Sequence, residues 1–123
     1  MKKSIEESGG EAEVYQIDLS IIQQVKDFIV LFKKNNNSLN ILVNCAAIWH
    51  SDSEAFANKD YSTFEQKTVI DTMNVGIIAL VILTHGLIDI MPKDSSIINI
   101  SGTFENGAKG WLPYYFSKKQ LKI

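Results

Sequence analysis

The pattern of apolar and polar positions along the chain predicts alternating strands and helices. Residues 12–18, within AEVYQIDL, have the character of a short strand. A helix is predicted next, with Ser20 as its N-cap, because apolar residues recur at helical spacing at Ile21, Ile22, Val25, Phe28, Ile29 and Phe32. The polar run NNNS at residues 35–38 then marks a loop. After it, residues 40–45 form a continuous apolar run of strand length with β-branched side chains.

The second half of the chain repeats this order. A long helix is predicted from Phe64 to Met91, with a capping box in STFE at residues 62–65, and Pro92 stops it. A third strand is predicted at residues 96–101, followed by a loop at 102–113 and the start of another helix. Parallel strands need crossover helices, so this order predicts an α/β domain in three layers with a parallel sheet.

Composition narrows the class of function. The chain has 123 residues, of which 46% are hydrophobic and 21% charged, which fits one globular domain spanning 1–123. Its net charge of -2 gives no electrostatic reason to bind nucleic acid or an anionic membrane. The single cysteine, Cys45, excludes an internal disulfide, and with His50 and His85 it makes no recognisable zinc site.

The expected location is the cytoplasm. The first ten residues, MKKSIEESGG, lack the apolar core of a signal peptide. The longest apolar run, at residues 75–83, is shorter than the roughly 18 residues that would indicate a membrane span.

Polar or small residues follow each predicted strand. The first strand ends at Asp18, the second at Asn44-Cys45-Ala46-Ala47, and the third at Ser101-Gly102. In open parallel sheets, ligands bind at the carboxyl ends of the strands, so these residues are candidates for a binding site. Taken singly, each has a plainer interpretation, such as a helix cap for Asp18 or an ordinary strand end for Ser101.

The closing stretch GWLPYYFSKKQLKI holds two tyrosines, each with a lysine four residues later. Tyr114 is paired with Lys118, and Tyr115 with Lys119. Positions i and i+4 share one helix face, so either pair could place a phenol beside an ammonium group. A free tyrosine has a pKa of about 10, and a nearby cation favours the phenolate. Spacing alone leaves both pairs open.

Five motifs in order resemble the classical short-chain dehydrogenase/reductase family. They are DLS at 18–20, LVNCAA at 42–47, NVG at 74–76, IINISG at 97–102 and YYFSK at 114–118. In that family a serine directly precedes the catalytic lysine. Ser117 precedes Lys118 here, which selects Tyr114, and the 13-residue spacing from Ser101 to Tyr114 is typical of the family.

The resemblance implies a role for each matching residue. The implied catalytic residues are Asn74, Ser101, Tyr114 and Lys118. The implied cofactor-binding residues are Asp18, Leu19, Asn44, Ala46, Tyr114 and Lys118. The implied cofactor is NAD or NADP, the substrate is a small carbonyl or alcohol, and the implied assembly of the parent protein is a homo-oligomer. For Asn74, satisfaction by nearby backbone stays open as the alternative to a catalytic role.

The departures from the family are mainly absences. The sequence shows no glycine-rich pyrophosphate loop and nothing that matches the family's first two or last two strands. The expected architecture is therefore a partial Rossmann-like fold, and the chain has the character of a fragment. Without the glycine turn, the 123 residues are expected to bind a nicotinamide cofactor weakly or not at all by themselves. The alternative function is a non-catalytic remnant or interaction module.

Overall fold

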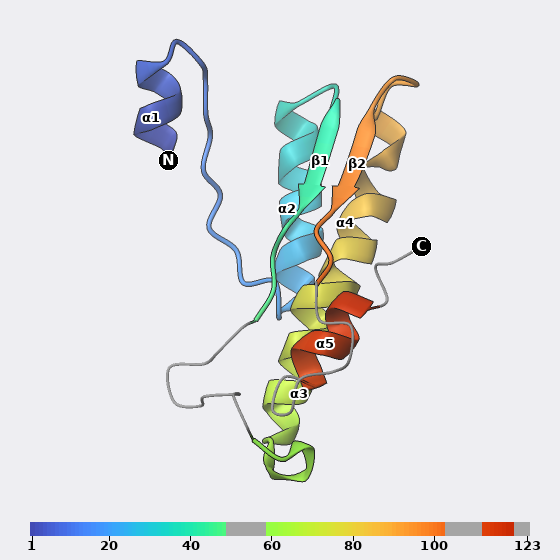
Figure 1. Ribbon diagram of the computed structural model, residues 1–123. Helices are drawn as coiled ribbons and strands as arrows, with labels where there is room; N and C mark the ends of the chain where they lie inside the picture. The colour runs from blue at the N-terminus through green and yellow to red at the C-terminus, as the bar shows by residue number, and fades with distance from the viewer. Residues whose placement is uncertain (49–58, 103–111, 120–123) are drawn as a thin grey trace.

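The computed structural model describes residues 1–48, 59–102 and 112–119 of the chain (Figure 1). Its α-helices and strands are α1 (Lys2–Glu7), α2 (Ile22–Asn35), β1 (Ile41–Asn44), α3 (Gln66–Met73), α4 (Ala79–Leu87), β2 (Ser96–Asn99) and α5 (Leu112–Lys119). Short turns of other helix types are η1 (Tyr61–Thr63), η2 (Asn74–Ile78) and η3 (Ile88–Ile90). Most of the predicted loop at 102–113 lies outside the described residues.

The sheet of the described part is formed by β1 and β2, which are parallel. Their register pairs Ile41 with Ser96 and Asn44 with Asn99. This confirms the two strands predicted at residues 40–45 and 96–101 and the parallel α/β class. The long helix between them is the crossover that a parallel pair requires (Figure 1).

The strand predicted at residues 12–18 is wrong. This segment runs as a coil between α1 and α2 and joins neither strand of the described sheet (Figure 1). The ring of Tyr15 instead packs edge-on against Phe28 and Phe32 of α2, with centroid distances of 5.2 and 6.5 Å. A strand is stabilised by hydrogen bonds to a neighbour, and no strand of the described residues lies beside this segment.

Helices α2 and α4 pack together and cover one face of the sheet. Buried Val25 and Ile29 of α2 meet Ala79 and Leu87 of α4, and Leu42 of β1 packs against this core. The alternate strand residues Ile41 and Val43 are exposed, which is the period-two pattern of a strand covered on one face.

Two contacts set the approach of α2 to α4. A Cβ atom at Gly86 would lie 2.6 Å from Ile29 Cδ1, so the missing side chain lets the helices come close. At the end of this interface, Lys33 Nζ pairs with Asp89 Oδ2 at 2.5 Å. Both side chains of this ion pair remain partly exposed, so solvent screens the attraction between them.

The predicted long helix is present, but its start and interior differ from the prediction. The helix runs from Gln66 to Ile90 and contains the π-helical turn η2. The capping box is wrong, because Glu65 is the N-cap and makes no side-chain hydrogen bond there. Residues 61–63 form η1 instead, where the Thr63 hydroxyl donates to Asp60 O at 2.7 Å.

The start of α2 also differs from the prediction. Its N-cap is Ile21, not Ser20, and the cap makes no side-chain hydrogen bond. The Ser20 hydroxyl donates instead to Asp18 Oδ1 at 2.7 Å. A hydroxyl committed to a preceding carboxylate does not cap the helix that follows it.

By length and composition, the helix Gln66–Ile90 is able to cross a membrane. Its 25 residues include an 18-residue window with a mean hydropathy of 1.9. The whole helix therefore has the length and apolar character that the shorter run at residues 75–83 lacks. One such helix is weak evidence for a membrane span. Here α2 and α5 pack against it, as is typical of a helix within an α/β domain.

Replacing Val25 with alanine is expected to lower the free energy of unfolding by about 2 kcal/mol, because two methyl groups leave a fully buried site. Val30 lies on the same helix but is 71% exposed, so Val30→Ala is the matched control and should change stability little. Urea denaturation of each variant measures the difference. Equal losses from both substitutions would contradict the placement of the core.

Candidate active site at the strand ends

The carboxyl ends of β1 and β2 are joined by polar contacts. The Asn44 side-chain amide donates from Nδ2 to Asn99 Oδ1 at 2.9 Å, across the in-register pair that ends the sheet. The backbone N–H of Ile100 donates to Asn44 O, also at 2.9 Å. Asn44 is buried, so its amide has the partner that a buried polar group requires.

Lys118 joins the same two strand ends from α5. Its Nζ donates to Ala46 O at 3.1 Å and to Ile100 O at 2.9 Å, and only 3% of the residue is exposed. Burial lowers the pKa of Lys118 from its ordinary value, and the nearby Cys45 offsets part of that effect. A buried ammonium group therefore lies where β1 and β2 end.

Tyr114 and Ser101 lie close to this lysine. A Cβ atom at Gly102 would lie 3.1 Å from Lys118 Cβ and 3.6 Å from Tyr114 Cε1. The glycine directly follows Ser101, so the chain leaving β2 passes against the side of α5 that carries Tyr114 and Lys118. The structure thus places Tyr114 and Lys118, two of the four residues predicted to be catalytic, beside the segment that contains Ser101.

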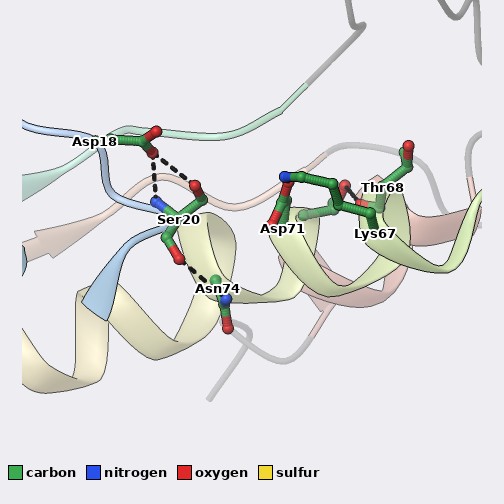
Figure 2. A network of polar contacts seen from close by, with 7 residues as sticks. Asp18, Ser20, Lys67, Thr68, Asp71 and Asn74 are labelled. Carbon is green, nitrogen blue, oxygen red and sulfur yellow. Dashed lines mark hydrogen bonds and ion pairs between the residues drawn. The ribbon is translucent and has the colours of Figure 1, made fainter. Parts of the chain in front are cut away.

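Asn74, the fourth of them, contacts a different segment. It is the first residue of η2, and its Nδ2 donates to Ser20 O at 3.1 Å (Figure 2). The amide therefore has a backbone partner, as the plainer interpretation of Asn74 expects. Interruptions of a helix by a π-helical turn are frequent at functional sites.

Asp18 lies in the turn that Asn74 contacts. Its Oδ1 accepts hydrogen bonds from the Ser20 hydroxyl at 2.7 Å and the Ser20 backbone N–H at 2.9 Å. These bonds, with a smaller contribution from the Lys67 charge, lower the pKa of Asp18 below its ordinary value. Figure 2 shows the Lys67–Asp71 ion pair of α3 beside this turn.

Removing the Ser20 hydroxyl is expected to raise the pKa of Asp18 toward its ordinary value of about 3.9. Because folding lowers this pKa, the turn contributes stability above about pH 4 that is lost as the pH falls through the folded value. Ser20→Ala should therefore weaken the acid dependence of stability. A carboxyl NMR titration measures the shift, with Ser8→Ala as the control, because the Ser8 hydroxyl bonds to Ser4 O instead. An unchanged Asp18 titration in Ser20→Ala would contradict the assigned cause.

A cavity of about 200 Å³ opens beside the end of β1. Its lining includes Leu19, Asn44 and Ala46, three of the residues predicted to bind cofactor, together with Val43, Cys45, Val75, Ala79, Leu80 and Leu83. The lining is mostly apolar, and Asn44 is its one residue with a polar amide side chain. The described residues contain no group of three or more His, Cys, Asp or Glu side chains that could hold a metal ion.

Two features of the site were missed from the sequence. The first is the hydrogen bond between Asn99 and Asn44. The sequence hints at it, because an asparagine inside the otherwise apolar run IINI needs a hydrogen-bonding partner. The second is the close contact of Ser117 in α5 with Gly76 in η2. The sequence does not predict it, because the two residues are far apart in the chain. Tyr115, the second tyrosine, contacts Phe116 at a ring-centroid distance of 6.0 Å, and the side chain of Lys119 lies outside the described part.

A parallel α/β domain with polar side chains gathered at its strand ends has the general architecture of doubly wound nucleotide-binding proteins. The family model described as short chain dehydrogenase matches residues 1–122. The chain therefore belongs to the short-chain dehydrogenase family. Among curated proteins, none matches the chain significantly by sequence.

Solved structures share this fold. A short chain dehydrogenase from Burkholderia cenocepacia J2315 in complex with NADP is 20% identical, with a TM-score of 0.81 over 98% of this chain and 47% of its own. A metagenomic short-chain oxidoreductase in complex with NADP is 24% identical, with a TM-score of 0.83 over 95% of this chain and 51% of its own. The landomycin C-6 ketoreductase LanV with bound NADP and rabelomycin is 24% identical, with a TM-score of 0.79 over 98% of this chain and 49% of its own. The chain thus spans about half the length of the solved structures it matches.

Proposed function

We propose that this chain carries the catalytic residues of an NAD(P)-dependent oxidoreductase that interconverts a small carbonyl compound and its alcohol. One observation supports this most strongly: the buried Lys118 ammonium lies between the ends of two parallel strands, one helical turn from Tyr114 and beside the segment containing Ser101. Membership of the short-chain dehydrogenase family supports the reaction class.

The strand-end cavity fits part of a nicotinamide cofactor. Its apolar lining with one buried amide suits a flat ring held by few polar groups. Solved structures of the same fold hold NADP, which supports this assignment. The residues that would hold the cofactor are Asp18, Leu19, Asn44, Ala46, Tyr114 and Lys118. When bound, the cofactor supplies or accepts the hydride.

The protein's own residues would manage the proton and orient the substrate. In the direction of reduction, the Ser101 hydroxyl donates a hydrogen bond to the substrate's carbonyl oxygen. The Tyr114 phenol gives its proton to that oxygen as the substrate carbon accepts the hydride, and the product is an alcohol. Lys118 places a positive charge near the developing phenolate and stabilises it. In the direction of oxidation, each transfer runs in reverse.

Asn74 would support the proton transfer through a water molecule. Within the described part of the chain, its Nδ2 donates to the Ser20 carbonyl. An asparagine amide offers two N–H groups and an oxygen, so further positions are suited to hold water.

The proposed assembly is a homo-oligomer in the cytoplasm, with α4 in the interface. Only 17% of the apolar window of the helix Gln66–Ile90 is buried within the chain. Ile78, Val81 and Ile88 of this region are exposed. A second copy packed on this surface would remove these apolar side chains from water.

The proposed function is tested by assaying the protein that carries this chain with NADPH and NADH against a panel of aldehydes and ketones. The expected result is carbonyl-dependent oxidation of one of the two cofactors. If neither cofactor binds in a fluorescence titration and no carbonyl is reduced, the proposal fails and the non-catalytic interaction module is favoured.

A further inference from the structure

Gly76 lies at a close approach between the long helix and α5. It is buried within η2, two residues after Asn74, and α5 packs along α3 and η2. A Cβ atom at Gly76 would lie 2.6 Å from Ser117 Cβ and 2.8 Å from Ser117 Oγ. Real Cβ atoms essentially never approach so closely, so any side chain at Gly76 would move α5 away.

Ser117 forms the other half of this contact. It is fully buried, and its hydroxyl donates to Tyr114 O at 2.8 Å, within its own helix. Lys118 directly follows Ser117, and Tyr114 lies one helical turn before Ser117. The contact therefore joins Gly76, two residues after Asn74 on the long helix, to Ser117, the residue before Lys118 on α5.

A second close contact holds α5 at Lys118, the residue after Ser117. A Cβ atom at Gly102 would lie 3.1 Å from Lys118 Cβ, and Lys118 Nζ bonds to Ile100 O. The helix is thus held both by η2, through Ser117, and by the end of β2, through Lys118. A displacement caused at Gly76 would reach Lys118 and Tyr114 directly, because packed interiors transmit strain.

We propose that Gly76 and Ser117 are positioning residues, whose contact fixes where Tyr114 and Lys118 lie relative to Asn74 and the strand ends. This inference rests on the proposed function, since it concerns the geometry of that site. A misplacement of about 1 Å can lower a reaction rate about 10²-fold.

The test is a set of variants in the protein that carries this chain. Gly76→Ala is expected to lower kcat for carbonyl reduction about 10–100-fold. Adding Ser117→Gly removes both atoms that the new methyl group meets, so it should recover most of that loss. Adding Ser117→Ala removes only the hydroxyl and keeps the 2.6 Å Cβ contact, so it should recover little.

A second readout separates positioning from loss of folding. If Gly76→Ala moves α5 away from the strand ends, Lys118 leaves its partners Ala46 O and Ile100 O and its buried position, so the pH midpoint of alcohol oxidation should differ from that of the wild type. Ser117→Gly in the Gly76→Ala background should restore the original pH midpoint. A merely less stable protein would keep its pH midpoint and show a lower melting temperature.

Gly86→Ala is the matched control. A Cβ atom there would also meet a neighbour at 2.6 Å, but that neighbour is Ile29 Cδ1 in the interface of α2 with α4, away from the strand ends. This substitution should lower the melting temperature and leave kcat and the pH midpoint unchanged.

The outcomes distinguish this inference from the proposed function. A wild-type protein that reduces no carbonyl compound overturns the proposed function itself. With an active wild type, the positioning role is overturned if Gly76→Ala keeps its kcat. It is also overturned if the lost kcat is not recovered by Ser117→Gly in a variant that melts cooperatively.

Discussion

Replacing Tyr114 with phenylalanine in the protein that carries this chain is expected to lower the rate of carbonyl reduction about 10²–10⁴-fold. Phenylalanine keeps the ring beside Gly102 but has no proton to give to the substrate oxygen. The fold should survive, because phenylalanine retains the ring that lies beside Gly102. Steady-state rates with the preferred cofactor measure the loss, and thermal melting checks the fold.

Tyr115→Phe is the matched control for this result. Tyr115 is the next residue of the same helix, and its ring packs near Phe116. Most of the activity should remain, because it is Tyr114 whose ring lies beside Gly102, the residue that follows Ser101. Equal losses from both substitutions would contradict the choice of Tyr114.

Replacing Lys118 with methionine is expected to lower both activity and stability. Methionine fills similar volume but leaves the Ala46 and Ile100 carbonyls without the ammonium that bonds to them. Losing hydrogen bonds from a charged donor costs about 1.5–3 kcal/mol, although relief of the desolvated charge offsets part of this. We therefore expect a net loss of about 1–3 kcal/mol in the free energy of unfolding, with the rate of reduction lowered about 10²-fold or more.

Lys93→Met is the control for the loss of one positive charge. Lys93 is exposed between η3 and β2, so its substitution should change stability and rate little. Urea denaturation and steady-state kinetics on both variants give the comparison. A fully stable and active Lys118→Met would show that the lysine neither joins the strand ends nor supports catalysis.

The elements that could be predicted from sequence are those whose residues carry a strong local pattern. The strand containing Ile41–Asn44 and the helix containing Val25 and Ile29 have clear apolar periodicity, and both are present. The segment at residues 12–18 has a strand-like composition but joins no strand in the described structure. Composition cannot supply a neighbour, and pairing with a neighbour is what makes an extended segment a strand.

The start of each helix was predicted less well than its interior. Ser20 and the STFE run both fit capping patterns, but the Ser20 hydroxyl bonds to Asp18 and residues 61–63 form a short turn. In both places a local hydrogen bond competes with capping, and sequence spacing does not decide between the two.

The candidate site could be predicted as a set of residues but not as a geometry. The motifs identified Ser101, Tyr114 and Lys118, which the fold brings close together. They gave no sign that Lys118 donates to two backbone carbonyls, because those contacts join residues 72 and 18 positions apart in the chain. The contact of Gly76 with Ser117 was hidden for the same reason.

The most direct test of the central claim is deuterium transfer from a reduced nicotinamide cofactor in which both hydrogens at carbon 4 are deuterium. The protein that carries this chain is incubated with the labelled reduced cofactor and a carbonyl substrate, and the alcohol is analysed by mass spectrometry and NMR. The proposed function predicts one deuterium on the carbon that bears the new hydroxyl group, and almost none when Tyr114→Phe is used under the same conditions. An alcohol without deuterium, or equal labelling by wild type and Tyr114→Phe, would contradict hydride transfer assisted by Tyr114.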